Sequence, residues 1–198
     1  MLTRYAITRR ADSDGVNALV AERDYVLAHI VAQLHRAKPL DGGQLIFKGG
    51  TALRLVHIAN YRYSADLDFT IIDGSVAAAV VAMTAVLNAA REHAEFPVLE
   101  FNESDGRIAY VGPLHAGKPR YLKLDISDSE FVATVEQRTI LDDVWSDLPQ
   151  ALPFFVYPVG EIAAEKLRCI IQRVQCRDLY DIFRLIDDMN VPLDEVVP

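Results

Sequence analysis

Residues 45–72 of the chain read LIFKGGTALRLVHIANYRYSADLDFTII, and the central elements of the fold can be predicted from this stretch. It begins with the apolar run Leu45–Phe47, which ends near two adjacent glycines, and helical spacing of apolar residues follows from Thr51 to Ile58. After a polar interval, Asp66–Ile72 has the composition and alternation of a strand. The order of elements is therefore strand, glycine turn, helix and strand.

Two carboxylates lie on one face of the second of these strands. Successive side chains of a strand point to opposite faces, so Asp66 and Asp68 share one face while Leu67 and Phe69 occupy the other. Neighbouring carboxylates repel each other unless a cation lies between them, and Mg²⁺ is a cation that such hard oxygen ligands prefer. The pattern predicts a magnesium site on this face.

A third carboxylate joins the site if a later strand lies beside the first two. In the run Arg120–Ile126, leucines mark the buried face and Asp125 lies on the other. Three carboxylates of this kind hold two magnesium ions, which activate an attacking hydroxyl and stabilise the leaving oxygens of a phosphoryl displacement. The sequence thus predicts Asp66, Asp68 and Asp125 as metal ligands.

The glycine turn predicts a phosphate site close to these carboxylates. Gly49 and Gly50 allow the backbone to approach a phosphate, and the amides of the first helical turn, from Thr51 onward, hold anions. The guanidinium of Arg54, one turn further along, would reach the same phosphates. An ordinary strand-to-helix turn also uses glycines, so it is the nearby carboxylates that favour phosphate binding.

The rest of the chain predicts an α+β fold with a mixed sheet flanked by helices. We expect helices at 14–37, 76–94, 160–174 and 179–188, strands at 97–102, 107–111 and 120–126, and a short edge strand at 138–141. Asp105-Gly106 marks a hairpin turn between the first two of these strands. We expect residues 1–150 to form the core with its N-terminal helix, and residues 151–198 a helical part packed on that core.

Composition excludes several classes of protein. The chain has 198 residues, of which 51% are apolar, and its net charge is −8. This acidic balance argues against indiscriminate DNA binding but leaves a local basic groove open. No apolar run is long enough to span a membrane, and the start resembles no secretion signal, so we expect a soluble, cytoplasmic protein. The spacings typical of zinc sites, serine hydrolases and P-loop enzymes are absent from the sequence.

The motifs together resemble the AbiEii/MenT nucleotidyltransferase-like toxin family, which belongs to the DNA polymerase β type superfamily. The resemblance rests on Lys48–Arg54, on Arg62 and Ser64 with the Asp-x-Asp strand, and on Glu161–Leu167 and Arg177–Asp181. Threonine stands at position 51, where the superfamily usually has serine. The resemblance implies a polymerase-β-like core and Mg²⁺-dependent transfer of a nucleotide from an NTP to an acceptor hydroxyl. In characterised toxins of the family the acceptor is the 3′ end of tRNA, and a cognate antitoxin is encoded alongside.

The resemblance also implies roles for particular residues. It implies catalytic roles for Asp66, Asp68, Lys166 and Asp181, and nucleotide binding by Lys48, Gly49, Gly50, Thr51, Arg54, Ser64 and Lys166. Lys166 falls within an apolar helical stripe. An ordinary lysine there packs its stem on the core and extends its amine to water, whereas a functional lysine directs the amine into the cleft. Two roles fit Asp181. In the first it orients Lys166 or the acceptor, and in the second it pairs with a neighbouring arginine of its own helix. Ser64 is either a local backbone partner or a phosphate contact.

Two other functions fit the same residues. One is transfer of a nucleotide to a protein or a small molecule instead of RNA. The other is a module that has kept the fold, has lost turnover and acts only through a binding partner. The complete set of carboxylates and the presence of Lys166 count against the second, because an inactive site would be expected to lose its charges.

Overall fold

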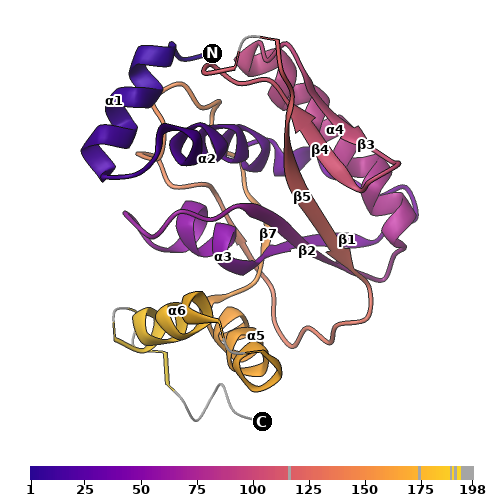
Figure 1. Cartoon of the computed structure of the whole chain (residues 1–198). Coiled ribbons are helices and arrows are strands. Elements are labelled where there is room, and N and C mark those ends of the chain that lie inside the picture. The colour runs from indigo at the N-terminus through magenta and orange to yellow at the C-terminus, as the bar shows by residue number, and fades with distance from the viewer. Residues whose placement is uncertain (116, 174, 188, 190, 193–198) are drawn as a thin grey trace.

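The computed structural model describes residues 1–115, 117–173, 175–187, 189 and 191–192. Within these residues the chain forms a seven-stranded mixed sheet with the order β3-β4-β5-β2-β1-β7-β6. Helices α1, α2 and α4 lie on one side of the sheet and the α5–α6 hairpin lies on the other (Figure 1). The predicted α+β fold is confirmed.

The elements have the following bounds. The strands are β1 (Gln44–Lys48), β2 (Asp66–Ile72), β3 (Leu99–Asn102), β4 (Arg107–Tyr110), β5 (Arg120–Ser127), β6 (Glu136–Arg138) and β7 (Phe154–Val156). The helices are α1 (Arg4–Asp14), α2 (Ala18–Val31), α3 (Gly49–Ala52), α4 (Val76–Ala94), α5 (Val159–Gln172) and α6 (Cys176–Asp187). A 3₁₀ turn spans Leu34–Arg36, and a π-helical turn, Leu53–His57, continues α3.

The centre of the sheet aligns the strands that carry the carboxylates. Strand β2 pairs antiparallel with β1 on one side and parallel with β5 on the other, with Asp68 opposite Asp125. The alternate residues of β2, Leu67 and Phe69, are buried in the core. Because one face of β2 is fixed by this burial, the acidic residues must point to the opposite face.

Several predicted boundaries are wrong. The predicted helix at 14–37 is α2 followed by the 3₁₀ turn, and α2 begins after Asn17, whose side chain accepts from the Leu19 amide. Helix α1, which ends before Gly15 in the left-handed conformation, is not among the predicted helices. The edge strand predicted at 138–141 is β6, at 136–138, because it pairs with β7. Strand β7 lies in a proline-rich interval that predicted no strand. Val174 and Asp188, the expected last residues of the final two helices, lie outside the described residues.

Candidate active site

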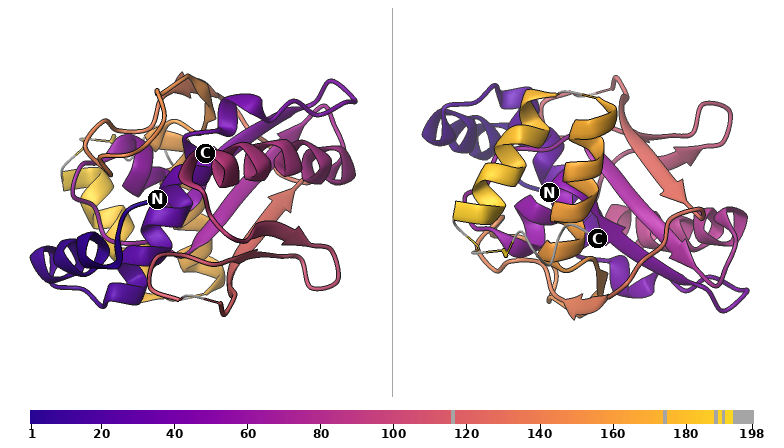
Figure 2. Two further views of the ribbon diagram at one scale, coloured as in Figure 1. Left: turned by 90° about the horizontal axis from the view of Figure 1, so that it is seen from above. Right: turned by 90° about the horizontal axis from the view of Figure 1, so that it is seen from below.

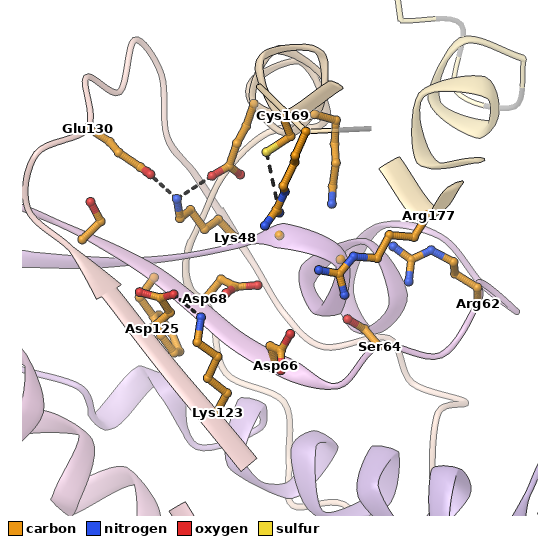
Figure 3. A pocket seen from close by; sticks show the side chains of 17 residues that line it. Lys48, Arg62, Ser64, Asp66, Asp68, Lys123, Asp125, Glu130, Cys169 and Arg177 are labelled. Atoms are coloured by element: carbon orange, nitrogen blue, oxygen red, sulfur yellow. Dashed lines mark hydrogen bonds and ion pairs between the residues drawn. The ribbon is translucent and has the colours of Figure 1, made fainter. Parts of the chain in front are cut away.

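A cavity of 320 Å³ lies between the acidic face of the sheet and the α5–α6 hairpin (Figure 3). Its walls come from β1, β2 and β5, from the segment before β2, and from both helices of the hairpin. The charged side chains that line it are Lys48, Arg62, Asp66, Asp68, Lys123, Asp125, Glu130, Glu165, Lys166, Arg173 and Arg177. Gly49, Gly50 and Ser64 line it as well.

The three predicted metal ligands all line this cavity, because β5 lies directly beside β2. Burial, together with the nearby charges of Asp66, Glu165 and Asp125, raises the pKa of Asp68 to about 6. Carboxylates grouped in this way are a hard, anionic donor set that suits Mg²⁺.

The donors are not gathered around one point. The Asp125 carboxylate accepts from Lys123 at 2.5 Å, and both side chains are more than half exposed. Among the described residues, no three side chains of His, Cys, Asp or Glu stand close enough together to hold a metal ion as they are. A metal ion that used all three carboxylates would therefore have to draw Asp125 away from Lys123.

Gly49 allows the backbone to pass close to Asp68. Its φ is +78°, a conformation that favours glycine, and a Cβ there would lie 2.5 Å from Asp68 Oδ2. A Cβ on Gly50 would lie 3.1 Å from Ser64 Oγ and 3.2 Å from the Arg62 guanidinium. The glycine turn therefore lies between the acidic strand on one side and Ser64 and Arg62 on the other.

We expect Gly49→Ala to lose most of its nucleotidyltransferase activity, because the new methyl group would displace the Asp68 carboxylate. Gly42→Ala is the matched control, since Gly42 has a φ of +84° and open space around its Cβ position. Both variants should be destabilised by about 1 kcal/mol through backbone strain. Thermal melting and incorporation of labelled nucleotide measure the two effects, and equal activity losses in both variants would contradict the argument.

Two of the predicted nucleotide-binding residues do not reach the cavity. Arg54 is buried, where its guanidinium contacts Asp24 at 3.1 Å and donates to the Tyr61 carbonyl at 2.7 Å. Thr51 is also buried, and its hydroxyl donates to the Asp66 carbonyl at 2.5 Å. Both side chains hold the glycine turn and the start of β2 in place, and the structure does not bring them to the position predicted for phosphates.

Lys48 lines the cavity but is held by two carboxylates. Its amine donates to Glu130 and, at 2.6 Å, to Glu165 (Figure 3). Burial alone would lower the pKa of Lys48, but the two carboxylates hold it above its usual value. Neither glutamate is predicted by a sequence pattern. Glu165 directly precedes Lys166 within the Glu161–Leu167 motif, whereas Glu130 lies in a loop with no recognisable pattern.

Lys166 points into a network of buried charges. Its amine contacts Asp178 at 2.9 Å and Asp181 at 3.1 Å, and both aspartates are fully buried. Asp181 also accepts from Arg62, at 2.6 and 2.5 Å, and from the Tyr61 hydroxyl at 2.8 Å. Asp181 thus joins two cations of the cavity, one of them the Lys166 amine that it was predicted to orient.

Arg177 lies at the same end of the cavity as Arg62 and Ser64 (Figure 3). It is exposed, and within the described part of the chain it makes no hydrogen bond or ion pair. The other cations of the cavity, in contrast, face carboxylates. Arg177 is therefore available to an anionic ligand, a role that the sequence analysis did not assign to it.

The raised pKa of Asp68 predicts a gain in stability from Asp68→Asn. In the metal-free wild type the ionised form of Asp68 is disfavoured by burial and by its acidic neighbours, so folding is weakened at neutral pH by up to about 3 kcal/mol. The variant lacks this charge and should melt higher than the wild type at pH 7.5. The difference should shrink as the pH falls below 6, where wild-type Asp68 is protonated. A difference in melting temperature that does not change with pH would contradict this.

These features define a class of protein. Carboxylates on adjacent strands line one cavity with a glycine turn and several arginines. Together with a match to a family of nucleotidyltransferases, they make the chain a nucleotidyltransferase. The family profile described as "Nucleotidyl transferase AbiEii toxin, Type IV TA system" matches residues 33–197, and the chain belongs to this family. It is accordingly a nucleotidyltransferase toxin of a type IV toxin–antitoxin system, which implies an antitoxin partner.

The structure is also similar to a solved one. MenT4, a nucleotidyltransferase toxin from Mycobacterium tuberculosis H37Rv, superposes with a TM-score of 0.68 and 22% sequence identity. The superposition covers 98% of this chain and 77% of MenT4, and at this identity it supports the fold. No curated protein matches the sequence. In the part of the chain that the structure describes, no helix is long and apolar enough to cross a membrane.

Proposed function

We propose that the protein uses Mg²⁺ to transfer a nucleoside monophosphate from an NTP to the 3′ end of tRNA, and thereby blocks translation. The observation that carries the reaction type is the placement of Asp66, Asp68 and Asp125 on adjacent strands, all lining one cavity. The choice of acceptor rests on the resemblance of the motifs to toxins that modify tRNA ends. The substrates of this reaction also favour a cytoplasmic location.

In this proposal the three carboxylates hold two ions. The bound Mg²⁺ ions would neutralise charge on the phosphates and on the attacking and leaving oxygens. The acceptor oxygen forms a bond to the α-phosphorus, the bond to the bridging oxygen breaks, and pyrophosphate leaves. Most of the acceleration should come from positioning and charge neutralisation by the chain's own residues.

The triphosphate fits the end of the cavity at the glycine turn. Gly50 and Ser64 lie together there, and Arg62 and Arg177 supply guanidinium groups suited to phosphate oxygens. Lys166, fixed by its two aspartates, adds a third cation. In this proposal residues 1–150 supply the metal ligands and the glycine turn, and residues 151–198 supply Lys166 and Asp181.

The experiment that tests this function is an incubation of the protein with total RNA, Mg²⁺ and each α-labelled NTP in turn. We expect label in RNA of tRNA size, dependent on Mg²⁺ and on one or more of the four nucleotides. Label in a protein band or in a small solute, with none in RNA, would support the alternative acceptors. If nothing is labelled and calorimetry detects no metal-dependent binding of NTP, the chain is an inert binding module.

A further inference from the structure

The sheet face that carries the carboxylates continues past the cavity. On β5, alternate residues Tyr121, Lys123 and Asp125 point to this face, whereas Leu122 points to the core and is buried. Tyr121 is 49% exposed, and the side chain of Lys123 is 59% exposed. Seen from below, α5 and α6 lie in front of one part of the sheet, and β5 is in open view beside them (Figure 2, right). An aromatic ring and a cation therefore face solvent next to the active site.

The strand register adds a second cation to this surface. Lys123 is paired with Asp66 of β2 on one side and with Arg107 of β4 on the other. Arg107 is exposed and, within the described residues, its side chain makes no hydrogen bond or ion pair. Tyr121 pairs with Ala109 of β4, and the tyrosine is about half exposed. We name Arg107, Tyr121 and Lys123 the β4–β5 patch.

The geometry of phosphoryl transfer indicates from which side of the active site the acceptor arrives. Attacking and leaving oxygens lie roughly in line on opposite sides of the phosphorus. Figure 3 shows Arg62, Ser64 and Arg177 on one side of the central carboxylates and Lys123 with Asp125 on the other. Because the arginine end suits the triphosphate, the acceptor must arrive from the end at β5.

We propose that the β4–β5 patch binds the unpaired 3′ end of the acceptor RNA, with a base stacked on Tyr121 and backbone phosphates against Lys123 and Arg107. The inference rests on the proposed function and adds to it the path of the acceptor. Stacking on an aromatic ring suits bases of any sequence, and it requires a base that is not already stacked within a duplex. Lysine and arginine supply the positive charge for the adjoining phosphates.

The first test is kinetic and uses Tyr121→Ala. We expect its KM for the RNA acceptor to rise about 10-fold or more, with the KM for NTP unchanged. Tyr121→Phe keeps the stacking ring and should remain close to the wild type. Tyr5→Ala is the matched control, since Tyr5 is an exposed tyrosine on α1 that does not line the cavity. Circular dichroism should show that all three variants are folded.

The second test measures binding directly. Fluorescence anisotropy compares a labelled RNA hairpin that ends in unpaired 3′ nucleotides with a blunt hairpin of the same stem. We expect the wild type to prefer the overhanging hairpin, and Tyr121→Ala to lose that preference. For Arg107→Ala, the slope of log affinity against log salt should fall by about 0.7, as expected for the loss of one phosphate contact to a single strand.

The outcomes separate this inference from the proposed function. If the wild type labels RNA but Tyr121→Ala keeps the wild-type KM for RNA, the proposed role of the β4–β5 patch is wrong, while the proposed function is still supported. If the wild type labels only protein or a small solute, the proposed acceptor is wrong, and the proposed binding of RNA by the β4–β5 patch is wrong as well. An equal rise in the KM of RNA and of NTP would also overturn the patch, because it would indicate a general disturbance of the site.

Discussion

Asp66→Ala should reduce incorporation of labelled nucleotide by about 10³-fold or more. Asp66 lines the cavity at the start of β2, beside Lys123 of β5 and opposite the glycine turn. The proposed mechanism places no other side chain at this position to hold the metal ion, so its loss should prevent correct placement of the triphosphate. Single-turnover incorporation from an α-labelled NTP, at saturating NTP and Mg²⁺, measures the effect on the chemical step.

Asp128→Ala is the matched control for this substitution. Asp128 is an exposed aspartate just after β5, close to the site but outside the residues that line the cavity. We expect it to retain incorporation within about threefold of the wild type, as for an ordinary surface substitution. Calorimetry should show weaker Mg²⁺-dependent binding of NTP to Asp66→Ala but not to Asp128→Ala. Full incorporation by Asp66→Ala would refute the proposed role of the carboxylates.

The central strands could be predicted because their patterns are local. Alternation within Asp66–Ile72 and Arg120–Ile126 already separates the acidic face from the buried face, and burial in the structure follows it. The pairing of the two strands is a long-range property, so the sequence could make Asp125 a ligand only on condition that they are neighbours. The register of β2 and β5 meets that condition by placing Asp125 opposite Asp68.

The roles of the basic residues could not be predicted in the same way, because each depends on which acid lies nearest in space. Arg54 is one helical turn from the glycines, yet its partner is Asp24, 30 residues earlier. Lys48 lies beside the glycines in sequence, yet Glu130 and Glu165 hold it from distant segments. Only the fold brings these partners together, and it leaves Arg177 as a cavity cation that the motif analysis did not assign.

This distribution of partners also explains how an acidic protein can bind a polyanion. The net charge of −8 is a property of the whole chain, whereas an RNA end meets only one surface of it. In the cavity, Lys48 and Lys166 are each held between two acids, and they provide fixed rather than mobile charge. The more exposed cations lie at the two ends, Arg177 at one and Lys123 at the other. Such an arrangement favours selective contact with phosphates over general attraction to nucleic acid.

The second large effect is expected at Asp181, which lies where four side chains meet. Burial alone would raise the pKa of Asp181, but the hydrogen bonds from Arg62 and the charge of Lys166 hold it below its usual value. The carboxylate is therefore ionised at neutral pH, and it fixes two cations that line the cavity from different parts of the chain. Asp181 is the ion-pair partner of Arg62, whereas Lys166 keeps a second contact to Asp178 at 2.9 Å. The Tyr61 hydroxyl, the fourth group, supplies only a further hydrogen bond to Asp181.

Asp181→Asn should lower kcat about 10²-fold, because loss of the charge lets Lys166 and Arg62 move relative to the triphosphate. It should also destabilise the protein by about 3 kcal/mol, since the buried Lys166 and the half-buried Arg62 lose their common partner. Asp187→Asn, an exposed substitution on the same helix, should change neither quantity. Tyr61→Phe separates positioning from charge: it keeps both ion pairs and should retain most of the kcat. Activity is compared well below the melting temperature of each variant, so a kcat for Asp181→Asn equal to that of the wild type would show that the carboxylate serves folding alone.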